Sequence, residues 1–329
     1  MPEQHDLESS NSSEKSLVTT VNKSLCDALL TSIVASELSY IYDSKSPKFQ
    51  QKQEELKQAL NLQDGENIEV RQFFKDPARS SDIDPAGCVI IIKDESGKPK
   101  EAIVSYHGTN SARDALIDGR ALRTSAPELG EGAQVHSGFY NNFQASKDNM
   151  YQIFKDININ NPDLGTIPVK FVGHSLGGAV TQIAALDASK NHKDLLEVSS
   201  VQTVGGPKVF SRATAQNYNE TLGSVTTRLQ NKQDPVPKVP PESMGYGSAG
   251  PKVMVDLSKD PHSTLTYRDG VAGIVKSIEQ GGKIARAPSK HLIAEEMRQA
   301  LVNKSSLGIR RSSGLSFMGF KNSNSTQSR

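Results

Sequence analysis

The spacing of apolar residues near the start of the chain predicts two helices. Between residues 21 and 42 the apolar side chains recur every three to five positions, which places them on one face of a helix: Leu25, Leu29, Ile33, Leu38 and Ile41. Residues 49–60 offer a second helical stretch. We expect both helices to brace a sheet from outside.

The segments that follow have the pattern of buried strands. Residues 68–74, 87–92 and 101–106 are rich in β-branched and other apolar side chains, and a Gly-Lys-Pro turn precedes the last of them. Helical and strand patterns then alternate: a helix over 141–158, a strand over 168–172, a helix over 179–189, and strands over 198–204 and 224–230. This alternation predicts an α/β fold with a mainly parallel central sheet covered by helices on both faces.

Length and composition favour one large domain with polar ends. The 329 residues are 35% hydrophobic and 23% charged, a balance typical of a globular fold with solvated extensions. Both ends are rich in polar residues, so we expect disordered tails over residues 1–16 and 305–329. Residues 17–304 then form the α/β domain with its N-terminal helical extension. The C-terminal tail also contains some basic and apolar residues. The alternative to a solvated tail is therefore a tail that transiently contacts a membrane surface.

Charge and cysteine content argue against several classes of protein. With 38 basic and 37 acidic side chains, the chain has no overall field that would attract nucleic acid. Cys26 and Cys88 have neither metal-ligand nor Cys-x-x-Cys spacing, so a reducing compartment is the simplest interpretation and pairing of the two thiols the alternative. Residues 1–16 lack the apolar core of a signal peptide. We therefore expect a cytoplasmic location, with export without a cleaved signal as the alternative.

A Gly-His-Ser-Leu-Gly run occupies residues 173–177, between a predicted strand and a predicted helix. In that setting a serine is held on a sharp turn with its hydroxyl exposed above the sheet, the arrangement called a nucleophile elbow. Glycine is required at 173 and 177, because a side chain there would collide with the neighbouring strand or helix. We therefore predict Ser175 as a nucleophile, and a glycine-rich turn capped by serine is the structural alternative.

A serine hydroxyl becomes a nucleophile only when a histidine accepts its proton and an acid orients that histidine. In α/β-hydrolases the acid and then the histidine follow the serine along the chain. Asp234 lies after a predicted strand in a loop fixed by Pro235, and is the expected acid, although an aspartate that caps a turn is the alternative. For the base we favour His291, which opens an amphipathic segment and so lies just before a final helix. His262, in a less anchored Asp-Pro-His-Ser turn, is the second candidate.

The negative charge that develops on an attacked carbonyl oxygen needs two hydrogen-bond donors. The backbone amide of Leu176, directly after the nucleophile, is one expected donor. Thr109 is the other, through its amide and hydroxyl, because it follows the predicted strand over 101–106 in a Tyr-His-Gly-Thr segment. Gly108 allows the backbone to approach closely there. An ordinary turn at the end of a strand is the alternative.

Five motifs resemble the fungal-type, class 3 triacylglycerol lipases and occur in the order found in that family. They are Tyr-His-Gly-Thr at 106–109, Val-His-Ser-Gly-Phe at 135–139, Val-Gly-His-Ser-Leu-Gly-Gly-Ala at 172–179, Thr-Val-Gly-Gly-Pro-Lys-Val at 203–209, and the acid loop from 228 to 237. The co-occurrence is far more specific than any single motif.

The resemblance implies an α/β-hydrolase fold, with Ser175 as nucleophile, Asp234 as acid and His291 as base. It also implies that Thr109 and Leu176 form the oxyanion hole. The sequence departs from the family pattern at residue 107 and in the segment expected to hold a lid. A histidine stands at 107 in place of the usual arginine, and the segment expected to hold a lid, within residues 111–134, is less apolar than a lid that seeks an oil surface.

The expected activity is hydrolysis of acyl esters of lipids through an acyl-enzyme intermediate, which requires no metal or organic cofactor. Glycerides, phospholipids and lysophospholipids all fit as substrates. Acyl transfer or thioester cleavage by the same residues is one alternative. The alternative from another class is a catalytically inactive hydrolase fold that serves as a lipid-binding or interaction module.

Overall fold

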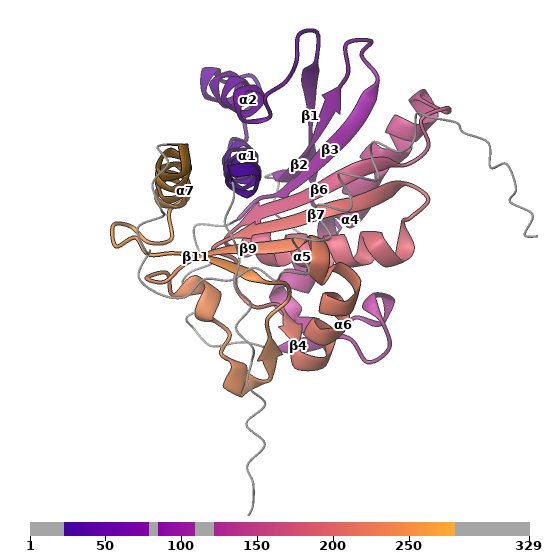
Figure 1. Cartoon of the computed structure of the whole chain (residues 1–329). Helices are drawn as coiled ribbons and strands as arrows, with labels where there is room; N and C mark the ends of the chain where they lie inside the picture. The colour runs from indigo at the N-terminus through magenta and orange to yellow at the C-terminus, as the bar shows by residue number, and fades with distance from the viewer. Residues whose placement is uncertain (1–22, 79–84, 109–121, 280–329) are drawn as a thin grey trace, which may run out of the picture.

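The computed structural model describes residues 23–78, 85–108 and 122–279, which fold around a seven-stranded sheet (Figure 1). The strands lie in the order β1-β2-β3-β6-β7-β9-β11. Their bounds are β1 Asn67–Phe74, β2 Pro85–Lys93, β3 Pro99–Tyr106, β6 Ile167–His174, β7 Leu196–Val204, β9 Thr226–Asn231 and β11 Lys252–Val255.

Five neighbouring strands of this sheet are parallel. β3 pairs with β6, β6 with β7, β7 with β9, and β9 with β11, all in the parallel sense. At the other edge, β1 pairs with β2 and β2 pairs with β3, both in the antiparallel sense. The predicted α/β fold with a mainly parallel sheet is therefore confirmed, and the carboxyl ends of β3, β6, β7 and β9 share one edge, where α/β folds place their sites.

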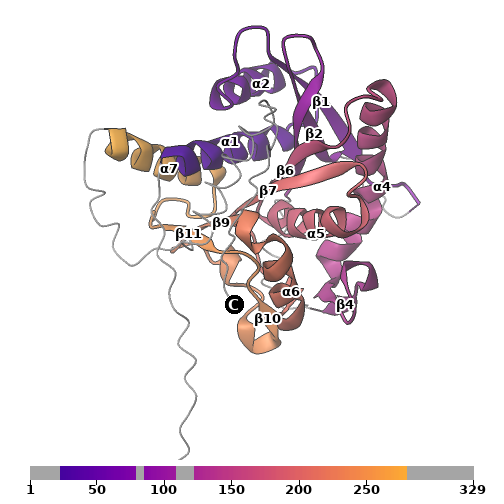
Figure 2. The ribbon, with the colours of Figure 1, turned by 45° about the vertical axis from the view of Figure 1, so that its right-hand side comes forward.

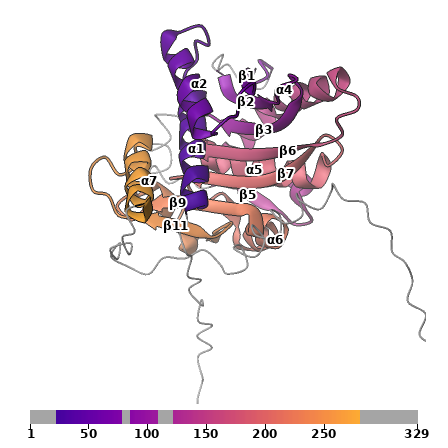
Figure 3. The same ribbon diagram turned by 45° about the horizontal axis from the view of Figure 1, so that its top comes forward.

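Helices cover both faces of the sheet, as Figure 3 shows. One face carries α1 (Lys23–Ser39), α2 (Pro47–Ala59) and α7 (Thr264–Glu279), and α1 runs across the strands. The other face carries α4 (Ser137–Asn160), α5 (Leu176–Asn191) and α6 (Arg212–Leu222). The two helices expected before the first strand are confirmed as α1 and α2, and they do brace the sheet from outside.

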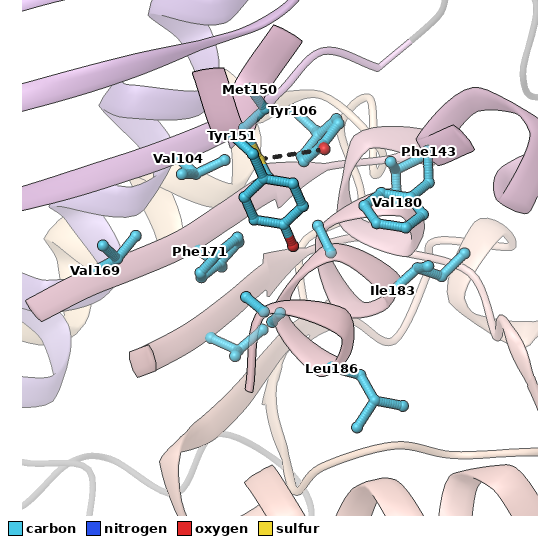
Figure 4. Packing of buried hydrophobic residues seen from close by; sticks show 14 of the residues in the cluster. Val104, Tyr106, Phe143, Met150, Tyr151, Val169, Phe171, Val180, Ile183 and Leu186 are labelled. Atoms are coloured by element: carbon cyan, nitrogen blue, oxygen red, sulfur yellow. Dashed lines mark hydrogen bonds between the residues drawn. The ribbon is translucent and has the colours of Figure 1, made fainter. Parts of the chain in front are cut away.

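The larger core lies between the sheet and helices α4 and α5. Apolar side chains of alternate strand positions, such as Val104, Val169 and Phe171, face Phe154 and Ile183 of these helices, and all five are buried. Figure 4 shows this packing at close range. The strand segments are nearly continuous apolar runs because their other face is covered too.

A second core joins the two ends of the described chain. Leu25, Leu29 and Ile33 of α1 pack with Tyr267 and Val271 of α7 and with the ends of β7, β9 and β11. Helices α1 and α7 therefore lie side by side, as Figure 2 shows. This contact matters for function, since the loop that enters α7 carries a site residue.

A small antiparallel sheet, ordered β10-β8-β5-β4, lies beside α6. Its strands are β4 Arg123–Ser125, β5 Gln134–His136, β8 Phe210–Ser211 and β10 Tyr246–Gly247. Short 3-10 turns lie in the segments between the larger elements: η1 Pro127–Leu129, η2 Gly223–Val225, η3 Val236–Lys238 and η4 Glu242–Met244. None of these elements was expected from the sequence, because strands of two or three residues carry no periodic pattern.

Several sequence predictions fall wholly or partly outside the described residues. Both tails do, and so does the first part of the segment expected to hold a lid, because residues 109–121 are not described. The tails and the lid stay predictions. In the part of the chain that the structure describes, no helix combines the length and apolar character needed to span a membrane.

Candidate active site

Three side chains from distant parts of the chain form a continuous hydrogen-bonded series at the carboxyl edge of the sheet. Ser175 follows β6, Asp234 follows β9, and His262 lies in the loop before α7. His262 Nε2 lies 2.8 Å from Ser175 Oγ, and His262 Nδ1 lies 2.7 Å from Asp234 Oδ2. A carboxylate oxygen only accepts, so Nδ1 carries the proton and Nε2 is free to accept the serine proton.

Ser175 occupies the sharp turn that the sequence predicts. Its backbone has φ 59° and ψ −131°, a conformation that side-chain-bearing residues rarely adopt. A hydrogen bond of 2.9 Å from the Ser175 amide to the Val204 carbonyl ties this turn to the end of β7. The strained backbone is thus held by the neighbouring strand, and it aims the hydroxyl at His262.

The glycines on either side of the elbow are needed for steric reasons, as expected. A Cβ at Gly173 would lie 2.5 Å from the Gly177 backbone, and a Cβ at Gly177 would lie 2.3 Å from the Tyr106 carbonyl oxygen. Real Cβ contacts are essentially never this short. The turn between β6 and α5 can therefore close only with glycine at both positions.

Asp234 is a buried carboxylate whose oxygens are well supplied with donors. Its exposed fraction is 0%. Oδ2 accepts from His262 Nδ1 and from the Tyr267 hydroxyl at 2.7 Å, while Oδ1 accepts from the Val236 amide at 2.9 Å. A buried charge is stable only when it is hydrogen-bonded in this way. The donors also fix the carboxylate plane against the imidazole.

Tyr267 is a site residue that the sequence did not reveal. Its hydroxyl donates to Asp234 and accepts from the Asn231 amide at 2.9 Å, so it joins α7 to the acid loop. Burial, reinforced by the charge of Asp234, raises the pKa of this hydroxyl, which keeps it a neutral donor. In the sequence, Tyr267 is marked only by its position five residues after His262. That position indicates a site residue only after His262 has been identified as the base.

The prediction that His291 is the base needs correction. His262 fills the position between Ser175 Oγ and Asp234 Oδ2, whereas His291 lies outside the described residues. A base on the loop before a helix is the expected arrangement, and His262 has it, because α7 begins at Thr264.

The structure places Leu176, one of the two expected oxyanion donors, directly after the nucleophile, and its role stays a prediction. Leu176 is the first residue of α5, and the first amides of a helix point outward without an intrahelical acceptor. Thr109 lies outside the described residues, so its role stays a prediction. Gly108, just before it, is packed tightly, since a Cβ there would lie 2.1 Å from the Tyr40 hydroxyl and 2.8 Å from the His174 carbonyl oxygen. The close approach expected at Gly108 is therefore present.

A cavity opens beside Leu176 and His107. Its lining mixes polar and apolar side chains: Lys75, Ala86, Tyr106, His107, Asn142, Ser146, Leu176 and Val180. Tyr42 contacts one of these lining residues, since its hydroxyl lies 2.9 Å from His107 Nε2. Within the described ranges, no group of three or more His, Cys, Asp or Glu side chains is placed to hold a metal ion.

The fold and the Ser175, His262 and Asp234 arrangement define an α/β-hydrolase. Residues 103–244 match the family model described as lipase (class 3). The lipase of Rhizopus niveus is 34% identical over 152 residues, which are 46% of this chain and 38% of that protein. The resemblance drawn from the motifs is confirmed over this part of the chain, which is similar to class 3 lipases.

A further relative and two solved structures are similar in sequence and in fold respectively. The secreted mono- and diacylglycerol lipase A of Penicillium cyclopium is 29% identical over 155 residues, 46% of this chain and 47% of that protein. The chain thus spans less than half the length of these curated relatives. The lipase structure from Rhizopus microsporus var. chinensis superimposes with a TM-score of 0.56 at 22% identity, covering 85% of this chain and 91% of that one. The Rhizomucor miehei triacylglyceride lipase gives 0.56 at 20% identity, covering 72% and 83%.

Proposed function

We propose that this protein hydrolyses acyl esters of lipids, with Ser175 as nucleophile, His262 as general base and acid, and Asp234 as the group that orients His262. The observation that carries the proposal is the hydrogen-bonded series from Ser175 Oγ through both ring nitrogens of His262 to Asp234 Oδ2. Such a series activates a hydroxyl that is otherwise a weak nucleophile.

The first half of the reaction forms an acyl-enzyme. Ser175 Oγ attacks the ester carbonyl carbon while its proton passes to His262 Nε2, and the imidazolium is stabilised by Asp234. The carbonyl oxygen becomes negative, and the Leu176 amide at the start of α5 donates to it. When this intermediate collapses, the C–O bond to the alcohol breaks, and His262 returns its proton to the departing oxygen.

The second half releases the fatty acid. Water attacks the acyl carbon and gives a proton to His262 Nε2. The bond to Ser175 Oγ then breaks, and that oxygen takes the proton back, so the free serine is restored and the acid leaves. Every proton in both halves moves through one ring nitrogen, which explains why the other is fixed on Asp234.

Glycerides are the substrate class that we propose within lipid esters. The support is the printed function of relatives, which include proteins named lipase and mono- and diacylglycerol lipase. The complete series of hydrogen bonds favours an active enzyme over an inactive binding module, since a module would not need Asp234 to be fully supplied with donors. Acyl transfer to other alcohols would use the same acyl-enzyme.

A substrate panel tests this function. Wild type should release fatty acid from mono- and diacylglycerols and from p-nitrophenyl esters, and Ser175→Ala should lose activity by about 10³-fold or more. Ser189→Ala is the matched control, because Ser189 lies at the far end of α5, where its hydroxyl donates to the Leu186 carbonyl. Equal turnover by wild type and Ser175→Ala would show that the proposed function is wrong. Cleavage of phospholipids in preference to glycerides would correct the substrate class alone.

A further inference from the structure

His174, the residue before the nucleophile, is buried and has a hydrogen-bond partner at each ring nitrogen. Its Nδ1 lies 2.9 Å from the Tyr40 hydroxyl, which follows α1. Its Nε2 lies 2.8 Å from the backbone carbonyl oxygen of His262. The two imidazoles also lie against each other, with ring centroids 4.8 Å apart. His174 therefore connects α1 to the backbone of the very residue that we propose as base.

The partners of His174 fix its tautomer. A carbonyl oxygen only accepts, so Nε2 must carry a proton and donate it to His262. Nδ1 is then an acceptor, and the Tyr40 hydroxyl donates to it. Burial, with a smaller contribution from His262, lowers the pKa of His174 to about 4, so the ring is neutral at ordinary pH. Burial also raises the pKa of Tyr40, which keeps that hydroxyl protonated.

The loop that carries His262 depends on hydrogen bonds to other elements for its position. It runs from the end of β11 to the start of α7, and Asp260 within it has φ 40°, a conformation that is costly for a residue with a side chain. Asn231 Nδ2 bonds the Pro261 carbonyl at 3.0 Å, which ties the residue before His262 to the acid loop. The bond from His174 ties His262 itself to the nucleophile elbow.

We propose that His174 is a positioning residue: its Nε2–H holds the His262 backbone at the distance from Ser175 that proton transfer requires, and Tyr40 holds His174 in the donating tautomer. This inference rests on the proposed ester hydrolysis. Because His174 and Ser175 are adjacent in the elbow, one short segment of backbone sets the position of the nucleophile and that of its base.

Two substitutions at His174 separate the donor from the acceptor. His174→Gln places an amide N–H near the site of Nε2 and keeps a donor for the His262 carbonyl. His174→Asn is too short to reach that carbonyl, but its amide oxygen lies near the site of Nδ1 and still accepts from Tyr40. The glutamine variant therefore retains the proposed positioning bond, and the asparagine variant loses it.

We expect His174→Asn to lower kcat on p-nitrophenyl butyrate on the order of 10- to 100-fold with little change in KM, because small misplacements of reacting groups have effects of this size. His174→Gln should recover most of kcat. Tyr40→Phe should give a smaller loss than His174→Asn, since it frees the tautomer without removing the donor. His192→Asn, the same change just beyond the other end of α5, is the control and should leave kcat unchanged.

Thermal midpoints of all variants accompany the kinetics, so that loss of folding is recognised. A merely structural His174 would make kcat follow the midpoint, with the asparagine and glutamine variants equally impaired, and that result would overturn the inference. Full activity of a folded His174→Asn would also overturn it, and the proposed function would still stand because the wild type hydrolyses the ester. A wild type without hydrolysis would overturn both.

Discussion

At the scale of single residues, Gly205 shows how closely the acid is packed. This glycine has φ +60°, and a Cβ on it would lie 3.0 Å from Asp234 Oδ2 and 3.2 Å from the Tyr267 ring. The position therefore combines a left-handed backbone with direct contact to two site residues. A methyl group there would displace the carboxylate oxygen that accepts from His262 Nδ1.

We expect Gly205→Ala to lower kcat by roughly tenfold or more, since it displaces Asp234 by a few tenths of an ångström. Gly97→Ala is the matched control. Gly97 has φ +80°, and a methyl group added to it would meet nothing within 4 Å, so both variants share a backbone cost of about 1–2 kcal/mol. Steady-state kinetics give kcat for both variants, and urea unfolding gives their free energies of unfolding. Equal kcat values for the two variants would contradict the packing described around Asp234.

At the scale of secondary-structure elements, the packing of α1 against α7 supports the histidine loop. Leu29 of α1 is 1% exposed and lies in the apolar cluster that includes Tyr267 and Val271 of α7. Ion pairs add to this contact, since Arg268 of α7 lies 2.9 Å from Glu55 of α2 and 3.5 Å from Glu37 of α1. The N-terminal helices are thus part of the support of the site.

Leu29→Ala should reduce the free energy of unfolding by about 2–5 kcal/mol, because it leaves a cavity between α1 and α7. Leu265→Ala, at a position 62% exposed in the first turn of α7, should change it by no more than about 0.5 kcal/mol. Chemical denaturation measures both. A loss below about 1 kcal/mol for the Leu29 variant would show that the two helices do not pack as described.

The elements with strong periodic or apolar patterns could be predicted from the sequence, and those without could not. The sequence predicts the strands over 101–106 and 168–172 because long apolar runs have few alternatives, and it predicts the elbow at Ser175 from its glycines. It does not favour His262 because the neighbouring residues show nothing that would hold this turn in place. Its anchors come from His174 and Asn231, which lie 88 and about 30 positions away, and one sequence does not show such contacts.

At the scale of the whole molecule, the buried neutral His174 makes stability depend on pH. Burial lowers its pKa from 6.5 to about 4 in the folded protein. The groups that face this ring are Tyr40, His262 and Asp234. Between pH 6.5 and about 4, the His174 ring stays unprotonated only in the folded state. Between pH 6.5 and about 4 the unfolded chain binds the additional proton, so the free energy of unfolding falls as the pH is lowered.

A variant without an ionisable side chain at position 174 shows how much of the pH dependence of the free energy of unfolding comes from His174. Each unit of pKa difference corresponds to about 1.4 kcal/mol, so the loss should reach a few kcal/mol at pH 4. His174→Gln should lose less stability than wild type between pH 7 and pH 4, measured by urea unfolding at fixed pH values. Parallel curves for the two proteins would show that His174 is not held neutral by the fold.

The rate at which a fluorophosphonate probe labels Ser175, compared between wild type, His262→Ala and His291→Ala, shows which histidine activates the serine. The probe reacts only with an activated serine hydroxyl, so its rate reports the base without reference to any substrate. We predict that His262→Ala slows labelling of Ser175 by about 10³-fold or more, whereas His291→Ala labels like wild type. Rapid labelling of His262→Ala together with slow labelling of His291→Ala would show that His291, and not His262, is the base.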